Sequence, residues 1–243
     1  MYPSILFEDN YLVVIEKGAG MVVNRAGTVA KETLQDWVES NIKFDSRDSP
    51  RHEESDFVKR SGIVHRIDKD TSGIVLCAKR EDAFLALQNQ FKERSVAKEY
   101  TLLVHGHLSP DRGEINAPIA RLPWNRMRFG VVPQGRDAVT EYEVVENKKL
   151  KVGEKEEKVS LVKAFPATGR THQLRVHFKH INHPIFGDRL YAGRKQGRRD
   201  AELLDRQFLH ASKISFTHPG SGESLTFDSP LPPDLVAITL KLQ

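Results

Sequence analysis

The order of the apolar segments along the chain sets the tightest limit on its fold. Most of these segments are short and either alternate with polar residues or are rich in β-branched residues, the pattern of strands. Strand-like segments occupy residues 5–24 (two strands), 73–79, 99–108, 138–146, 159–167 and 210–219, with strand or mixed character at 172–181. Helical spacing occurs in residues 33–44, 81–94 and 232–242. Because helices do not alternate regularly with strands, we expect an α+β fold with a mainly antiparallel central sheet and flanking helices and loops.

Capping and turn residues indicate where some of the predicted helices and strands begin or end. Thr33 is suited to be the N-cap of the first helix. The lysine- and glutamate-rich residues 147–158 separate two strand-like segments, which predicts a hairpin with a solvated tip. Residues 45–56 contain no apolar residue and are expected to form an exposed loop.

Composition narrows the class of protein. The chain has 243 residues, 39% of them hydrophobic and 29% charged, so we expect a globular protein with one domain over residues 1–243. No apolar run is long enough to span a bilayer, and the N-terminus lacks the pattern of a signal peptide. The single cysteine, Cys77, excludes an intrachain disulfide, fits a cytoplasmic location, and is expected to be buried and inert.

A polar block interrupts two apolar runs at residues 64–73, "VHRIDKDTSG". Asp, Ser and Gly are ordinary turn formers, so the block by itself favours a surface turn over an active-site loop. Asp68 and Asp70 are too close along the chain to face each other across a cleft, as glycosidase carboxylates do. One carboxylate acting alone as a nucleophile stays open.

Two segments are rich in arginine and also contain aromatic residues. Residues 121–136 include Arg121 and Arg128 together with Trp124, and residues 188–199 add five more cations. Arginine suits phosphates and aromatic rings suit unstacked bases, so these segments are compatible with RNA. A solvated basic face is the equally weighted alternative. The net charge of +4 permits nucleic acid as a partner without requiring it.

A second polar block, "TGRTHQLRVH", spans residues 168–177. Arg175 lies between Leu174 and Val176 and is expected to face the opposite side of a strand. If that side is buried, Arg175 needs an anionic partner. Four histidines nearby, His172, His177, His180 and His183, raise the alternative of a zinc-dependent hydrolase. However, the many cations of the segment and the absence of an HExxH pattern oppose it.

The two polar blocks resemble those of the RluA family of RNA pseudouridine synthases. "HRIDKDTSG" resembles that family's catalytic motif and "TGRTHQLRVH" its later arginine motif, and "HPIFGDRLY" follows in the same order. The resemblance extends over residues 5–233, nearly the whole chain. It implies a pseudouridine synthase catalytic fold and an isomerase that acts on uridines of structured RNA without cofactor or metal.

Roles follow from the matched positions. The resemblance implies that Asp68 is the catalytic aspartate, that Tyr100 stacks on the target base, and that Arg175 pairs with Asp68. Arg66 would replace the flipped uridine. The residues expected to contact the substrate are Arg66, His65, Arg170, Thr71, Gly73, Arg121 and Arg128.

The chain departs from the family pattern in two ways. The usual Lys-Pro-x-Gly reads Lys17-Gly18-Ala19-Gly20, which removes no chemical group. Many relatives carry an N-terminal S4 RNA-binding domain, whereas the matched core begins almost at residue 1 here. We therefore expect a stand-alone catalytic domain without an S4 domain, monomeric, whose partner is ribosomal RNA of the large subunit or transfer RNA. A binding module that holds RNA without chemistry is the alternative.

Overall fold

The computed structural model describes residues 2–25, 32–44 and 55–243. The chain forms two compact units, each built from two separate segments. Unit 1 contains Met1–Ala97 and Lys213–Ser229, and unit 2 contains Lys98–Ser212 and Pro230–Gln243. Each unit is described by itself below. That the whole chain acts as one catalytic domain stays a prediction.

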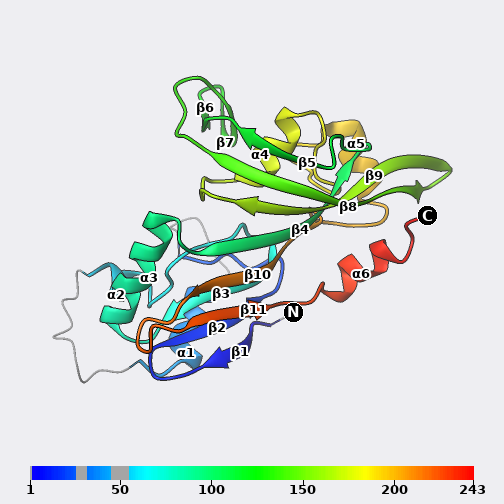
Figure 1. The fold of residues 1–243 in the computed structure, drawn as a ribbon. Coiled ribbons are helices and arrows are strands. Elements are labelled where there is room, and N and C mark those ends of the chain that lie inside the picture. Colours follow the sequence, from blue (N-terminus) through cyan, green and yellow to red (C-terminus); the bar gives the residue numbers. More distant parts are fainter. Residues whose placement is uncertain (1, 26–31, 45–54) are drawn as a thin grey trace. The chain divides into compact units, whose positions relative to one another are not determined.

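Unit 1 is a small sheet with helices. Its strands follow the order β1-β2-β3-β10, with β11 next to β10, and the pairs β1–β2, β2–β3 and β10–β11 are antiparallel. Figure 1 shows the helix α3 beside this sheet. The elements are β1 (Ser4–Glu8), β2 (Leu12–Lys17), α1 (Leu34–Asn41), α2 (Asp56–Lys59), β3 (Ser72–Ala78), α3 (Glu81–Glu93), the greater part of β10 (Leu209–Thr217), and β11 (Ser224–Asp228).

Burial of β3 organises the core of unit 1. All seven residues of β3 are buried, and Leu76 packs in one cluster with Phe84 and Leu87 of α3. Each such side chain contributes roughly 1.5–3 kcal/mol when it leaves water. Cys77 is buried in the same strand, as expected, and burial raises the pKa of its thiol, so it is a poor nucleophile.

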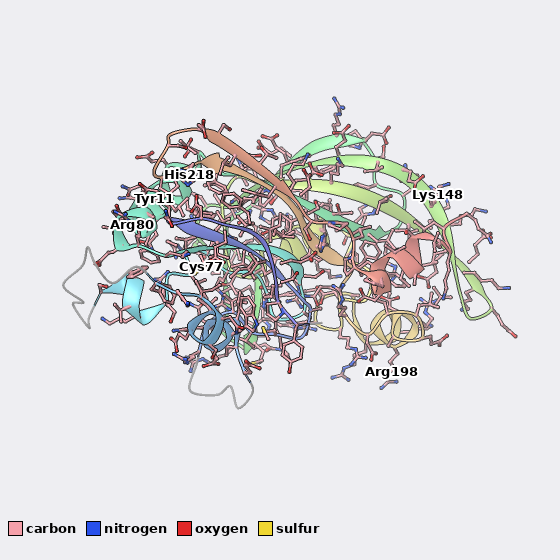
Figure 2. All side chains as sticks on the ribbon, turned by 90° about the horizontal axis from the view of Figure 1, so that it is seen from below. Tyr11, Cys77, Arg80, Lys148, Arg198 and His218 are labelled. Atoms are coloured by element: carbon pink, nitrogen blue, oxygen red, sulfur yellow. The ribbon has the colours of Figure 1, made fainter. Side chains whose placement is uncertain are left out.

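Side chains from three parts of unit 1 close one end of its sheet. Figure 2 labels Tyr11, Arg80 and His218 there. The Arg80 guanidinium lies 4.9 Å from the centre of the Tyr11 ring, and the His218 ring meets the same ring edge-on at 5.3 Å. His218 Nε2 also lies 2.7 Å from Asp9 Oδ2. These contacts tie the turn after β10 to the turn between β1 and β2.

Unit 2 is dominated by antiparallel strands. Its sheet has the order β10-β4-β9-β8-β5, and β6 and β7 form a separate hairpin. Figure 1 shows β8 and β9 as the two longest paired strands. The elements are β4 (Ala97–His105), β5 (Arg112–Asn116), β6 (Ile119–Leu122), β7 (Asn125–Val131), β8 (Val139–Val152), β9 (Lys155–Pro166), α4 (Gln173–His180), α5 (Arg194–Asp200), the start of β10, and α6 (Pro233–Thr239).

The α+β class with a mainly antiparallel sheet is confirmed. The helices predicted at residues 33–44, 81–94 and 232–242 correspond to α1, α3 and α6. Thr33 caps α1 as expected: its hydroxyl accepts from the backbone N–H of Asp36, whose carboxylate accepts from the N–H of Thr33. No helix in the described part of the chain is long and apolar enough to cross a membrane.

Three local expectations need correction. The hairpin of residues 138–167 exists, but its lysine- and glutamate-rich part continues as paired strand up to a turn at Gly153. Cross-strand ion pairs such as Lys149–Glu156, at 2.6 Å, suit these charged residues to exposed strands. Of the expected loop 45–56, residues 45–54 lie outside the described residues, and Ser55 caps α2.

The segment 172–181 is helical, whereas the sequence suggested strand or mixed character. Residues Gln173–His180 form α4, and six consecutive side chains of α4 are buried. The six buried residues, 173–178, alternate between polar and apolar side chains, which imitates the two-residue period of a strand. The strand interpretation of Arg175 was therefore wrong. Arg175 is buried, which is the condition under which it needs an anionic partner.

Candidate active site

The polar block of residues 64–71 forms an irregular loop in unit 1 that leads into β3. The chain enters it through Ser61 and Gly62, both with left-handed backbone (φ 49° and 74°). A Cβ on Gly62 would lie 2.0 Å from the carbonyl oxygen of Ala78, so the close approach of backbone to β3 requires glycine. Asp68 is half-buried in this loop, and its carbonyl oxygen accepts from Thr71 N–H at 3.1 Å.

A buried ammonium group holds the backbone beside Asp68. Lys17 is fully buried, and its Nζ donates to the carbonyl oxygens of Gly18, Met21 and Lys69 at 2.8, 2.9 and 3.0 Å. The Lys69 carbonyl also accepts from Gly20 N–H at 2.9 Å. The carbonyl of Lys69, one residue after Asp68, therefore accepts from two donors at the end of β2 and in the turn that follows.

The other loop residues with expected roles differ in exposure. Arg66 is exposed, whereas Thr71 and Gly73 are buried at the start of β3. The His65 ring is turned toward the protein: its Nε2 accepts from Leu76 N–H at 3.0 Å, and it stacks 4.7 Å from the Phe91 ring. This placement suits His65 to holding the loop on β3 and α3. Its substrate contact stays a prediction.

Tyr100 belongs to unit 2. It lies on β4 opposite Ala164 of β9 and is half-buried against the apolar cluster that contains Leu102 and Leu209. Its half-exposed position allows one side of the ring to pack and the hydroxyl end to reach solvent or substrate.

Arg175 is buried on α4 in a bidentate ion pair. Its Nε and Nη2 donate to the two carboxylate oxygens of Asp188 at 2.7 and 3.0 Å. Asp188 is fully buried and also accepts from the backbone N–H groups of Leu190 and Tyr191. The anionic partner that the sequence required for Arg175 within unit 2 is thus Asp188. The expected pair with Asp68 involves residues of different units and stays a prediction.

Tyr191 joins Arg175 to the β6–β7 hairpin. The Arg175 guanidinium lies 5.0 Å from the centre of the Tyr191 ring. The Tyr191 hydroxyl accepts from Phe129 N–H of β7 at 3.0 Å and lies 2.9 Å from His172 Nδ1. Arg128 Nη2 donates to the Leu190 carbonyl. The hairpin is consequently fastened to the segment that orients Arg175.

The tip of this hairpin is exposed and both basic and aromatic. Trp124 and Met127 are 78% and 76% exposed, and Arg126 beside them is exposed as well. The Arg121 guanidinium lies 5.1 Å from the Phe129 ring centre, and its Nη1 donates to the Arg126 carbonyl. Large exposed apolar side chains on a monomer mark contact surfaces.

Arg170 occupies the loop before α4. Its Nε donates to the carbonyl of Asp137 at 2.9 Å, and its backbone N–H donates to Gln173 Oε1 at 3.0 Å. The guanidinium is half-buried and therefore retains a face toward solvent. Its role in substrate binding stays a prediction.

Three of the four histidines of the zinc alternative, His172, His177 and His183, have separate hydrogen-bond partners within the chain. His177 Nε2 donates to the Ala117 carbonyl and Nδ1 accepts from the Thr140 hydroxyl, each at 3.0 Å, while His183 Nδ1 lies 2.8 Å from the His105 carbonyl. Burial lowers the pKa of His177, the hydrogen bond to Ala117 opposes this, and the charge of His180 adds to the lowering.

Among the described residues, the group with metal-ligand character is instead His105, Glu157 and Asp200 of unit 2, whose ligand atoms lie within 4.8 Å of one another. His105 Nε2 faces Asp200 Oδ2 at 3.0 Å, and Nδ1 faces Glu157 Oε2 at 3.4 Å. Because each ring nitrogen faces a different carboxylate, one ion would have to break the His105–Asp200 contact to bind all three. The arrangement suits an internal contact between His105 and Asp200, joined by a hydrogen bond, better than a metal site.

Sequence reasoning missed two residues of this region. Lys17 was noted only as part of a motif, yet its burial makes it the anchor of the Asp68 loop. A lysine at the end of an apolar strand, followed by two glycines, was the available signal. Asp188 was part of the quoted "HPIFGDRLY", but nothing in the spacing links it to Arg175.

Comparisons with known proteins agree with this reading. The family model described as RNA pseudouridylate synthase matches residues 11–180. The chain is 39% identical over 97% of its length to a ribosomal large subunit pseudouridine synthase D of Nitrosomonas europaea, and spans 64% of that protein. It is 41% identical over 93% of its length to an uncharacterized RNA pseudouridine synthase of Aquifex aeolicus, of which it spans 68%.

Among solved structures, the human RNA pseudouridylate synthase domain containing 1 is similar with a TM-score of 0.69 and 28% identity, covering 95% of this chain and 84% of that one. The family model covers more than half of the chain, and both relatives exceed 30% identity. The resemblance seen in the two polar blocks is thereby confirmed, and the chain belongs to the RNA pseudouridylate synthase family.

Proposed function

We propose that this chain isomerises specific uridines of structured RNA to pseudouridine, with Asp68 as the catalytic group. The observation that carries the proposal is the Asp68 loop: in a chain of this family, a buried ammonium group holds the carbonyl of Lys69, the residue that follows a half-buried carboxylate. Such fixation keeps a catalytic group in place without reorganisation during the reaction.

The reaction itself explains the residue types. The bond from uracil N1 to ribose C1′ breaks, the base turns, and a bond from C5 to C1′ forms. The C5 hydrogen leaves as a proton and N1 gains one, so atoms and electrons balance without a cofactor. A uridine inside a helix cannot turn, so it must first leave the stack at a cost of a few kcal/mol.

The other residues have roles that fit their positions. Arg66 is exposed on the Asp68 loop, where its guanidinium can fill the gap left by the uridine. Tyr100 offers a half-exposed ring for the base. Arg175 is held rigidly by Asp188, which suits a cation that must keep one orientation toward a carboxylate such as Asp68.

The β6–β7 hairpin supports RNA as the substrate. An exposed Trp124 can stack on an unpaired base, and Arg121, Arg126 and Arg128 surround it with positive charge. Stacking on an aromatic side chain is worth about 1–3 kcal/mol per base. Large-subunit ribosomal RNA and transfer RNA are the proposed substrate classes, and a monomer in the cytoplasm is the proposed state.

Tritium release tests the proposal. RNA labelled with tritium at uridine C5 loses the label to water when the bond to C5 forms. We expect release with the wild type and none with Asp68→Ala, while RNA affinity stays within about tenfold because binding rests on many phosphate contacts. Asp70→Asn, in the same loop, is the matched control and should retain release. Full turnover by Asp68→Ala would refute the assignment. RNA binding without release by the wild type would favour the non-catalytic module.

A further inference from the structure

The short helix α5 in unit 2 carries its charges on two sides. Gly197 and Asp200 are buried, whereas Arg194, Lys195 and Arg198 are exposed. Positions 194 and 198 are one turn apart, so their side chains share a face. Figure 2 shows Arg198 projecting away from the helix. Arg194, Lys195 and Arg198 together form the basic face of α5.

The inner side of α5 is fastened by an ion network. Asp200 is fully buried, and its Oδ2 accepts from Gly187 N–H at 2.9 Å and lies 3.0 Å from His105 Nε2. Arg199 Nη1 lies 2.7 Å from Glu157 Oε1. One acid and one arginine of the helix therefore serve to hold it, and the three exposed cations take no part in this attachment.

The basic face is unfavourable for the helix that carries it. Arg194 and Arg198 are like charges at i and i+4, which costs a few tenths of a kcal/mol. Arg194 and Lys195 lie in the first turn, where the helix dipole favours anions. Within the described part of the chain, none of the three forms an ion pair that would offset these costs.

Lysines on β8 show the usual arrangement of exposed cations. Lys148 Nζ lies 3.6 Å from Glu146, and Lys149 Nζ lies 2.6 Å from Glu156. Lys148 is half-buried and Lys149 is exposed, and both are neutralised by neighbours on the same hairpin. Both Lys148 and Arg198 are labelled in Figure 2. The basic face differs from these lysines because its three neighbouring charges are not neutralised by any residue that the structure describes, which leaves them available to an outside partner.

We propose that the basic face of α5 binds the phosphodiester backbone of the substrate RNA away from the target uridine. This inference rests on the proposed function. The segment "RKQGRRD" contains no aromatic residue, so it can neutralise phosphates but cannot stack bases, unlike the β6–β7 hairpin. Arg194 and Arg198 are about 6 Å apart along the helix, a separation that lets them contact neighbouring phosphates.

The salt dependence of RNA binding tests this inference. The triple variant Arg194→Gln, Lys195→Gln and Arg198→Gln removes the basic face with a residue of good helix propensity. The matched control is Lys148→Gln with Lys149→Gln. Binding of a transfer RNA transcript and a large-subunit ribosomal RNA transcript is measured from about 0.05 to 0.3 M salt, and each lost phosphate contact lowers the slope of log Kd against log salt by about 0.7–0.9.

We expect the triple variant to lower that slope by about two and to weaken binding about tenfold or more, while the control leaves both nearly unchanged. Its melting temperature should equal or exceed that of the wild type, since like-charge repulsion is relieved. At saturating RNA, tritium release by the triple variant should keep the wild-type kcat with a raised KM.

Two outcomes would overturn the inference. In the first, the wild type releases tritium, but the triple variant has the same slope of log Kd against log salt and the same KM as the wild type. In the second, the triple variant loses affinity for polyglutamate but not for RNA, which would assign the basic face to an acidic protein. An absence of release by the wild type contradicts the proposed function instead, and the binding slopes still decide whether the basic face contacts RNA.

Discussion

Each unit contains a buried cation, and the two are satisfied differently. Lys17 in unit 1 donates to three backbone carbonyl oxygens, whereas Arg175 in unit 2 donates to both oxygens of the Asp188 carboxylate. An ammonium group is a compact charge whose three donors can point in different directions, and a guanidinium is a flat fork that matches a carboxylate.

The difference shows what each cation does for the molecule. Lys17 collects carbonyls from separate turns, including that of Lys69, and so fixes the course of the backbone beside Asp68. Arg175 is itself the group that is fixed, because Asp188 and the Tyr191 ring determine where its guanidinium lies. Lys17 therefore positions a loop, whereas the guanidinium of Arg175 is itself held in one orientation by its neighbours.

Asp188→Asn should have the largest effect. The amide keeps the shape of the side chain but loses the charge and places an N–H among four donors. We expect the free energy of unfolding to fall by about 3–5 kcal/mol, as when one partner of a buried pair is removed. Urea denaturation measures this.

Asp205→Asn is the control for Asp188→Asn, because Asp205 pairs with Arg189 on the surface of the same unit. It should change stability by less than about 1 kcal/mol. Equal losses in the two variants would mean that Arg175 does not depend on Asp188.

Lys17→Met should have the next largest effect. Methionine approximates the length of the side chain but leaves three buried carbonyls without this donor, so we expect a loss of about 2–3 kcal/mol in the free energy of unfolding. Tritium release under conditions where the variant is folded should also fall, because the carbonyl of Lys69, one residue after Asp68, loses an anchor.

The control here is Lys79→Met in unit 1, since Lys79 pairs with the partly exposed Glu8 at 2.7 Å. It should cost less than about 1 kcal/mol. If Lys17→Met destabilises no more than Lys79→Met, the proposed difference between the two buried cations is wrong.

The smallest expected effect concerns the pH dependence of stability at His177. Among the described residues this side chain is buried without a carboxylate partner, so it would become an unpaired buried cation if it were protonated. Burial lowers the pKa of His177 in the folded chain. The unfolded chain therefore binds the proton more readily, and the stability from His177 is complete above about pH 6.5 and is lost as the pH falls below that value.

His177→Gln can keep the hydrogen bonds to Thr140 and Ala117 but has no proton to gain. We expect the melting temperature of the variant to fall less than that of the wild type between pH 7 and pH 5. Parallel decreases in the two proteins would show that His177 does not contribute to acid destabilisation.

Much of the fold was predictable because local signals and tertiary structure agree. The capped α1, the amphipathic α3 and the buried strand β3 all have a pattern that their surroundings reinforce. The prediction failed at α4, where buried polar and apolar residues alternate as in a strand, and at the β8–β9 hairpin, where charged residues form strand instead of turn. In both places tertiary context overrides local propensity.

The candidate site was predictable from its motifs but not in its supporting contacts. Sequence patterns marked Asp68, Arg66 and Arg175, since polar residues in apolar surroundings are conspicuous. The contacts of Lys17 with Lys69 and of Arg175 with Asp188 join residues 52 and 13 positions apart. Such pairings depend on how turns bring the backbone together, which no spacing rule encodes.

The division of β10 has a consequence for synthesis of the protein on the ribosome. Unit 1 needs Lys213–Ser229, so after its first 97 residues emerge it must wait while residues 98–212 are translated. At typical elongation rates this takes on the order of ten seconds. During that time the apolar edge of β3 lacks its neighbour β10, with Ile214 and Phe216 still absent from the core. Nascent chains of this protein should therefore be clients of chaperones that shield unpaired strand edges.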